Sequence, residues 1–193
     1  MAAGLVPGPA DGLISPAFNP AFELKVAFNG RDVTLGNLFR SSECKSAPAI
    51  NFSSDVHTEL DKSYLIMLVD PDAPTPDDPK FAFWRHWIQS GLQPPREDAP
   101  CVTFSQAALT EYLGPGPKDD SKPHRYLFLL FREPSGFHLQ KEDVGGEEFV
   151  QRRSFNAVEF IKTHHLELVG LNWMLGAGDG WQEQDLLTHH GSV

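Results

Sequence analysis

The alternation of hydrophobic and polar residues along the chain predicts a mainly β protein. Residues 22–28, FELKVAF, alternate apolar and polar positions and end at Asn29-Gly30, a pair that favours the tight turn of a β-hairpin. Two short runs, Tyr64–Val69 (YLIMLV) and Tyr126–Phe131 (YLFLLF), are apolar throughout. Both are too short for a buried helix, so we expect them to be strands in the core of a sheet.

Further segments extend this pattern and include a single helix. Residues 48–53 (PAINFS), 81–89 (FAFWRHWIQ) and 166–175 (LELVGLNWML) are expected to be extended. Between the last two, Ser154 is a favourable N-cap, and the helical spacing of apolar residues continues to about His164. Many short strands with one late helix predict a mainly β domain with peripheral α-helical segments.

The length of 193 residues is enough for one substantial hydrophobic core, so we expect a single domain over 1–193. Residues 1–20 are rich in Pro, Gly and Ala and are expected to form an irregular lead-in, and residues 176–193 a C-terminal tail. The N-terminus does not resemble a secretory signal, and the apolar runs are far shorter than a membrane span. With Cys44 and Cys101 expected to be free thiols, the sequence predicts a soluble, cytoplasmic protein.

The formal charge of -10 at pH 7 restricts the partners of the chain. Such a charge repels phosphate backbones and anionic lipid surfaces, so we expect no nucleic-acid partner and at most peripheral membrane contact. An anionic ligand would have to be held by a local site that acts against the overall field.

Polar residues stand directly beside the apolar segments at three places. At the first, Asp70 and Asp72 in DPDAP follow the first apolar run, where prolines prevent the strand from continuing. At the second, WRHW, the two-residue period of a strand places Trp84 and His86 on one face and Arg85 and Trp87 on the other.

The third place combines the loop GPGP, which contains Gly114 and Gly116, with His124 and Tyr126 on one face of the second apolar run. Glycines allow backbone N–H groups to approach a ligand closely and to form a cradle for an oxyanion. Histidine and tyrosine add hydrogen-bond donors, and a carboxylate can hold an imidazole in one tautomer. Together these residue types predict a pocket for a small anion.

Ordinary structural roles explain each cluster when it is taken alone. Asp70 and Asp72 are suited to capping a turn, His86 to a hydrogen-bonded core histidine, and GPGP to a surface loop. Two aspartates and two histidines could also bind a metal, but they lack a ligand spacing such as HxxxH. We therefore expect no metal and no cofactor.

The motifs DPDAP, WRHW, YLGPGP and HRY, in this order, resemble those of the phosphatidylethanolamine-binding protein (PEBP) family, and the resemblance covers about residues 20–175. That family includes Raf kinase inhibitor proteins, carboxypeptidase Y inhibitors and plant flowering regulators. The resemblance implies a divergent, fungal member with a large antiparallel sheet packed on a smaller sheet and with C-terminal helical segments. It also implies a metal-independent pocket for phosphate, a phospholipid headgroup or a carboxylate.

By motif match, the resemblance implies that the ligand-binding residues are Asp70, Asp72, Pro74, Trp84, His86, Gly116, His124 and Tyr126. We add Gly114, from the GPGP loop, and Phe83, which precedes Trp84. Phe83 stands where the family usually has Glu, which removes a carboxylate and adds apolar surface near the expected mouth. Gly91 and Lys118 also depart from the family pattern, in place of Asn and of the second proline of GPP.

Three classes of function remain open. The first is a binding module for a small anion that also regulates a protease or kinase partner. The second is a lyase, cyclase or isomerase of fungal secondary metabolism that acts on anionic, maleic-anhydride-type intermediates, with Asp70 or His86 as base and His124 or Tyr126 as acid. The third is a scaffold that uses its surface, and the fold alone does not decide among them.

Overall fold

The structure is a computed structural model that describes residues 5, 10–53, 61–96, 99 and 101–183. Its strands are β1 Glu23–Phe28, β2 Arg31–Asp32, β3 Leu38–Arg40, β4 Ala49–Ser53, β5 Tyr64–Asp70, β6 Trp84–Gln93, β7 Thr103–Phe104, β8 Ala108–Thr110, β9 His124–Arg132 and β10 Glu167–Ala177. Its helical elements are the 3-10 helices η1 Ser41–Cys44, η3 Lys141–Val144 and η4 Phe149–Arg152 and the α-helix α1 Ala157–Thr163.

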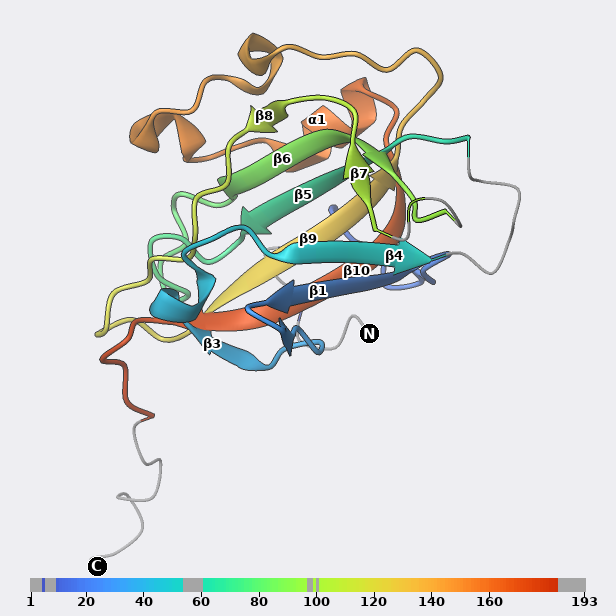
Figure 1. Cartoon of the computed structure of the whole chain (residues 1–193). Coiled ribbons are helices and arrows are strands. Elements are labelled where there is room, and N and C mark those ends of the chain that lie inside the picture. Colours follow the sequence, from blue (N-terminus) through green and yellow to red (C-terminus); the bar gives the residue numbers. More distant parts are fainter. Residues whose placement is uncertain (1–4, 6–9, 54–60, 97–98, 100, 184–193) are drawn as a thin grey trace, which may run out of the picture.

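The strands form a large and a small sheet (Figure 1). The large sheet has the order β3-β10-β9-β5-β6-β7, with β8 also paired to β6, and the small sheet has the order β2-β1-β4. All pairs are antiparallel except β3 with β10, which is parallel. The expected fold class is confirmed, with a parallel strand added at one edge.

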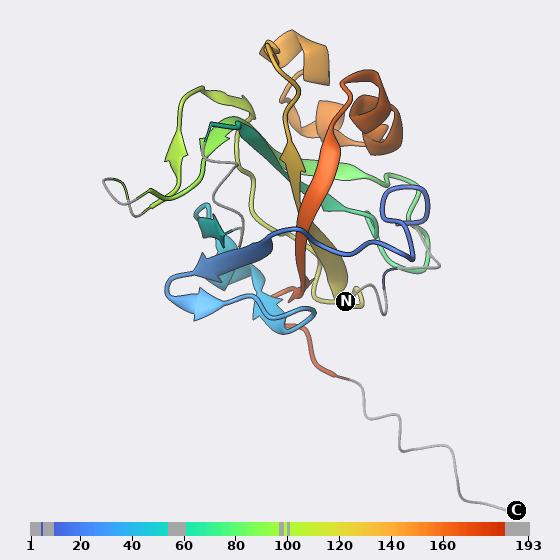
Figure 2. The same cartoon turned by 90° about the vertical axis from the view of Figure 1, so that its right-hand side faces the viewer.

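The large sheet is buried on both faces, which explains why β5 and β9 are continuously apolar. One face packs against the small sheet, and the other is covered by α1 and the N-terminal lead-in (Figures 1 and 2). The inter-sheet core includes Phe28, Phe52, Ile66, Leu68, Tyr126 and Phe128. The helix-side core includes Ile14, Met67, Val69, Leu129, Phe131 and Phe160. Alternate residues of each strand therefore serve different cores.

The segments expected to be an irregular lead-in and a C-terminal tail are partly ordered parts of the fold. Within the lead-in, Leu5, Leu13 and Ile14 are buried in the helix-side core, so the described part of this segment packs on the fold. At the other end β10 runs through Ala177, two residues into the expected tail, and residues 184–193 lie outside the described part.

The hairpin between β1 and β2 is confirmed, because Asn29 and Gly30 have φ values of 50° and 81°. The predicted N-cap of the helix is wrong. Asn156 caps α1 by accepting a hydrogen bond from the Glu159 amide, whereas the Ser154 amide donates to the carbonyl of Phe81. Pairing with a distant segment, which no local pattern reveals, removes Ser154 from the helix.

A β-bulge in β6 overturns the predicted face of Trp87. Val69 of β5 pairs with Arg85, but the preceding Leu68 pairs with Trp87, which leaves His86 as the extra residue. Trp87 therefore lies in the inter-sheet core, not on the face of Arg85. The strand also begins only at Trp84, so the first three residues of the expected extended segment 81–89 lie outside it.

None of the helices in the described ranges is long and apolar enough to cross a membrane. Cys44 is buried, Cys101 is exposed, and neither forms a disulfide, as expected for free thiols.

Candidate functional site

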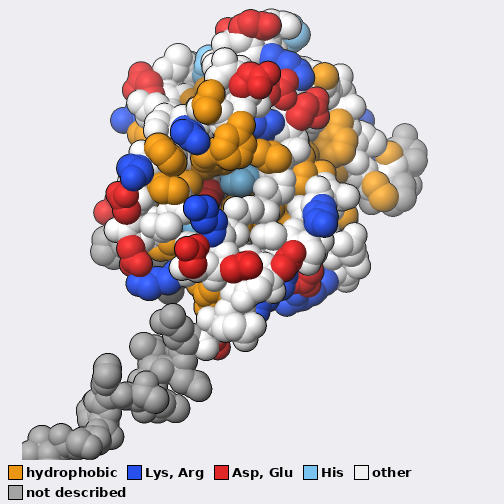
Figure 3. Space-filling view, turned by 90° about the vertical axis from the view of Figure 1, so that its left-hand side faces the viewer, with side chains coloured by type: hydrophobic (Ala, Val, Ile, Leu, Met, Phe, Trp, Pro, Cys, Tyr) orange, Lys and Arg blue, Asp and Glu red, His pale blue; other side chains and the backbone are white. Residues whose placement is uncertain are grey.

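The three polar clusters meet where β5 ends and β6 and β9 begin. Because neighbouring strands are antiparallel, the last residue of β5 lies beside the first residues of its two neighbours. Asp70 pairs with Trp84 in the register of β5 and β6, and His124 begins β9 on the other side. Figure 3 looks onto this end of the molecule and shows a histidine side chain in a hollow bordered by hydrophobic side chains.

Asp70 and His124 form a buried pair that also includes Ser121. His124 Nδ1 lies 2.8 Å from Asp70 Oδ2, and His124 Nε2 lies 3.1 Å from Ser121 Oγ. The Ser121 hydroxyl in turn donates to the Lys122 carbonyl at 2.9 Å. Because the one proton of the Ser121 hydroxyl is used on the Lys122 carbonyl, Ser121 Oγ is the acceptor in its contact with His124 Nε2. Both ring nitrogens of His124 are therefore occupied by neighbouring groups.

Asp72 is fully engaged by Arg125. Its Oδ2 accepts hydrogen bonds from the Arg125 amide at 2.7 Å and from Arg125 Nε at 2.9 Å, and its Oδ1 accepts one from Nη2 at 2.6 Å. The Asp72 amide donates to Asp70 Oδ1 at 2.6 Å, which is the turn-capping role considered from the sequence. We call Asp70, Asp72, Ser121, His124 and Arg125 the floor cluster, in which each carboxylate has a hydrogen-bonded side-chain partner.

His86 has one ring nitrogen engaged and the other open. Its Nδ1 lies 2.6 Å from the Leu113 carbonyl, which can only accept, so Nδ1 carries a proton. Within the described ranges Nε2 has no partner. Burial lowers the pKa of His86 below its ordinary 6.5, and the nearby charges of Asp70 and Arg152 act in opposite directions. The ring is therefore neutral at pH 7, with Nε2 available as a proton acceptor.

Tyr126 and Trp84 complete the wall around His86. The His86 ring centroid lies 5.2 Å from that of Tyr126 and 6.3 Å from that of Trp84. Tyr126 has a backbone hydrogen bond from Gly116, and burial raises the pKa of Tyr126, so the phenol keeps a proton that it can donate. Trp84 Nε1 is buried and has no acceptor among the described residues.

The remaining predicted residues have different environments. Gly116 is exposed and open, since a Cβ added there would meet nothing within 4 Å. At Gly114 the added atom would lie 2.4 Å from the Cys44 carbonyl oxygen, so this glycine serves close backbone packing. Pro74 is half-buried in the loop after β5.

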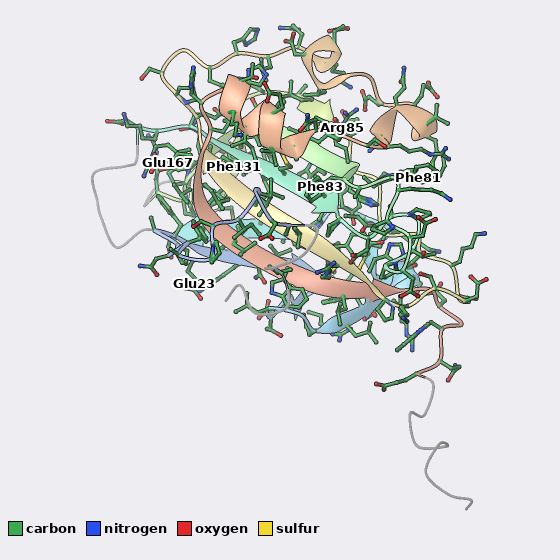
Figure 4. The ribbon with its side chains drawn as sticks, turned by 180° about the vertical axis from the view of Figure 1, so that it is seen from behind. Glu23, Phe81, Phe83, Arg85, Phe131 and Glu167 are labelled. Atoms are coloured by element: carbon green, nitrogen blue, oxygen red, sulfur yellow. The ribbon has the colours of Figure 1, made fainter. Side chains whose placement is uncertain are left out.

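Phe83 does not lie with His86 and Tyr126. It is half-buried and packs against the helix-side core on the opposite face of the sheet, where Figure 4 labels it near Arg85. Its carbonyl accepts a hydrogen bond from the Phe155 amide at 2.9 Å. The expectation that Phe83 adds apolar surface at the mouth thus has no support in this geometry.

Sequence reasoning missed Ser121 and Arg152. Arg152 is buried, and its Nη1 donates to the carbonyls of His86 at 3.1 Å and Glu111 at 2.9 Å. It thereby joins β6 to the loop that carries Leu113 and positions the His86 ring. The only available signal was a pair of arginines in an acidic chain, and this pattern does not distinguish a buried arginine from a surface one.

The site combines unmatched donors with one weak base. Tyr126 and Trp84 each have a proton to donate, and His86 can accept or, once protonated, donate one. The described residues contain no group of three or more Asp, Glu, His or Cys side chains placed to hold a metal ion. The arrangement fits an anion bound by neutral donors, to which His86 adds a charged donor only when its ring is protonated.

Comparison with known proteins places the chain in a family. The sequence pattern of the phosphatidylethanolamine-binding protein family matches residues 16–173. MOTHER of FT and TFL1 homolog 2 of rice (Oryza sativa) is 30% identical over 166 residues, which cover 85% of this chain and 86% of the relative. An uncharacterised protein of Saccharomyces cerevisiae is 29% identical over 175 residues, which cover 82% of this chain and 83% of the relative.

A third relative also has a solved structure. Carboxypeptidase Y inhibitor of Saccharomyces cerevisiae is 26% identical over 150 residues, which cover 65% of this chain and 68% of the relative. The crystal structure of carboxypeptidase Y inhibitor with its cognate proteinase has a TM-score of 0.71 at 22% identity and covers 88% of this chain and 90% of that chain. The yeast relatives are consistent with the expected fungal member. Because the family pattern spans most of the sequence, the chain belongs to the phosphatidylethanolamine-binding protein family.

Proposed function

We propose that the protein binds a small anionic ligand beside His86, Tyr126 and Trp84. The ligand is a phosphate, a phospholipid headgroup or a carboxylate, because each presents oxygen acceptors to hydrogen-bond donors. The unpaired thiols of Cys44 and Cys101 fit the cytoplasmic location expected from the sequence.

The observation that carries this proposal is that hydrogen-bond donors at the strand ends lack acceptors, whereas the carboxylates there already have partners. Trp84 Nε1 is a buried donor without an acceptor, and the phenol of Tyr126 has a proton free to donate. A buried donor without a partner, such as Trp84 Nε1, costs about 1–3 kcal/mol of free energy, which an anionic ligand would recover. The carboxylates nearby are already paired with His124 and Arg125, so they do not repel an anion as free charges would.

Thermal unfolding with inorganic phosphate tests the proposal. At a concentration one hundred times Kd the ligand stabilises the fold by about 2.7 kcal/mol, which raises Tm by about 5–10 °C for a chain of this size. We expect His86→Ala to lose this shift. His138→Ala, which changes an exposed histidine, should keep it.

A wild-type NMR titration with phosphate guards against poor folding of the His86 variant. The ring of His86 and the phenol of Tyr126 should respond, and the ring of His138 should not. Phosphate binding retained by His86→Ala, or a response confined to other histidines, would refute the site.

A second candidate is acid–base catalysis on the same ligand class, including the maleic-anhydride-type intermediates considered from the sequence. It is favoured by the neutral His86 with an open Nε2, which makes His86 the base and Tyr126 the acid. Asp70 and His124 bind each other and are positioning residues in this proposal. Deuterium incorporation from D2O into an anionic substrate with an acidic C–H bond would be measured, and an unchanged rate in His86→Gln would contradict it.

Regulation of a protease partner is a further candidate, favoured by the likeness to carboxypeptidase Y inhibitor. The test is hydrolysis of a peptide substrate by carboxypeptidase Y with increasing amounts of this protein. Full protease activity at a large excess would contradict this role.

A further inference from the structure

Arg153 lies among three aromatic rings at the edge of the site. Its Cζ is 4.4 Å from the ring centroid of Phe81, 5.6 Å from that of Phe149 and 5.7 Å from that of Trp84. Phe149 also makes an edge contact with Trp84, with ring centroids 4.7 Å apart. We call Phe81, Trp84, Phe149 and Arg153 the mouth cluster.

Arg153 has no hydrogen-bond or carboxylate partner within the described ranges, and its buried Nε is without an acceptor. The other arginines there all have partners: Arg125 binds Asp72, for example, and Arg132 binds Glu167. In a chain with 26 acidic and 16 Lys and Arg residues, an unpaired guanidinium held in place by three rings is unusual. Stacking leaves the edge of a guanidinium free for the bidentate binding of a carboxylate or phosphate.

The mouth cluster and the anion site share Trp84. The Trp84 ring centroid lies 5.7 Å from Arg153 Cζ and 6.3 Å from the His86 ring centroid, so Arg153 is within about 12 Å of the His86 ring. A small molecule of ordinary length can span this separation. In Figure 3, Lys and Arg side chains border the hollow together with hydrophobic ones.

We propose that Arg153 binds a second anionic group of the same ligand, so that the protein selects dianions such as dicarboxylates over matched monoanions. The proposal rests on the anion site proposed above. The alternative is that an apolar part of the ligand packs on the Phe149 ring, which is 61% exposed. The unpaired guanidinium, whose buried Nε has no acceptor in the described part of the chain, favours a charged group instead.

The test is calorimetric titration with pairs of acids of equal length: succinate with butyrate, adipate with hexanoate, and sebacate with decanoate. In the wild type the best dicarboxylate should bind at least about tenfold more tightly than its monocarboxylate, as expected for one added hydrogen bond to a charged group. Arg153→Gln should remove this preference and leave the affinity for the monocarboxylate unchanged.

Two further variants make the result specific. Arg153→Met keeps an apolar side chain over the rings and should also lose the preference, which covers the case of a poorly folded Arg153→Gln. Lys80→Gln removes an exposed cation that lies 5.9 Å from the Phe81 ring centroid and pairs with Asp78, and it should change nothing.

The outcomes separate the two proposals. A dicarboxylate preference that persists without Arg153 overturns the second binding group but leaves the anion site intact. Tighter binding of decanoate than sebacate, unaffected by Arg153, would identify an apolar subsite instead. Absence of binding by every acid and by inorganic phosphate would overturn the anion site and this inference with it.

Discussion

The floor cluster and the mouth cluster lie at the same end of the sheet but differ in how their polar atoms are satisfied. In the floor cluster, Asp70 and Asp72 have a partner for each carboxylate oxygen, and both nitrogens of His124 are engaged. In the mouth cluster, Trp84 Nε1 and Arg153 Nε are buried and have no acceptor among the described residues.

This difference separates residues that shape the site from residues that are able to bind. A saturated network is rigid and gives a ligand little to bond with, whereas unmatched donors gain from an added acceptor. His86, which is in neither cluster, has both properties: its Nδ1 is fixed by Leu113, and its Nε2 is open to a ligand. The predictions below test this division, in order of decreasing effect on stability.

Asp70→Ala should produce the largest loss of stability. The change leaves His124 Nδ1 and the Asp72 amide buried without an acceptor, and removing one partner of a buried pair costs about 3–5 kcal/mol. Urea unfolding measures the loss. Asp78→Ala, which removes an exposed carboxylate paired with Lys80, should change stability by less than about 0.5 kcal/mol. Equal stability of the two variants would show that the floor cluster is not structural.

The two glycines of the GPGP loop should differ in their response to alanine, with a loss of stability at Gly114 alone. Gly114→Ala places a Cβ 2.4 Å from the Cys44 carbonyl oxygen, and overpacking of this kind costs about 1–3 kcal/mol. Gly116→Ala meets nothing within 4 Å and should be close to neutral. Thermal unfolding compares them, and a more stable Gly114 variant would contradict the packing argument.

Stability and anion binding should depend on pH with opposite signs. Burial holds the pKa of His86 below 6.5, so below that pH the unfolded chain binds more protons than the folded one. The contribution of His86 to stability is therefore lost as pH falls below about 6.5. A bound anion favours the protonated ring, so affinity should rise over the same range. Sulfate, which does not titrate there, is the probe, and His86→Gln should abolish the rise. A flat sulfate affinity in the wild type would count against a protonated His86 in the complex.

Phe149→Ser should have the smallest effect. The ring is 61% exposed and makes one edge contact with Trp84, so we expect a loss of about 1 kcal/mol or less. Phe128→Ala, in the inter-sheet core, should lose about 3–5 kcal/mol in the same urea experiment. Comparable losses would mean that η4 is part of the core and not a surface feature of the mouth.

Much of the fold was predictable because the pattern of the sequence reflects local rules. The apolar runs at β5 and β9 mark strands buried on both faces, and Asn29-Gly30 marks a hairpin. Asp70, His86 and His124 lie together because their strands pair antiparallel, and this pairing was predicted from the resemblance to a known family.

The errors arise where distant segments decide the local structure. Ser154 is drawn away from the helix by its hydrogen bond to Phe81, and Phe83 turns to the helix-side core beside Phe155. The unmatched donor of Arg153 is likewise a property of the packed structure. Its position in the sequence, next to the buried Arg152, gives no indication of which arginine binds backbone carbonyls and which stacks on rings.

The bulge at His86 has a consequence for how this strand can change. Before it, Trp84 and His86 supply the site; after it, residues 87–89 pack in the sheet with the alternation shifted by one, and the register with β5 shifts again before Leu92. The extra residue separates two parts of the strand, so a substitution in one part does not change the direction in which the side chains of the other part point. Deletion of that single residue would move the side chains of one part to the opposite face of the sheet. The strand should therefore tolerate substitution better than deletion.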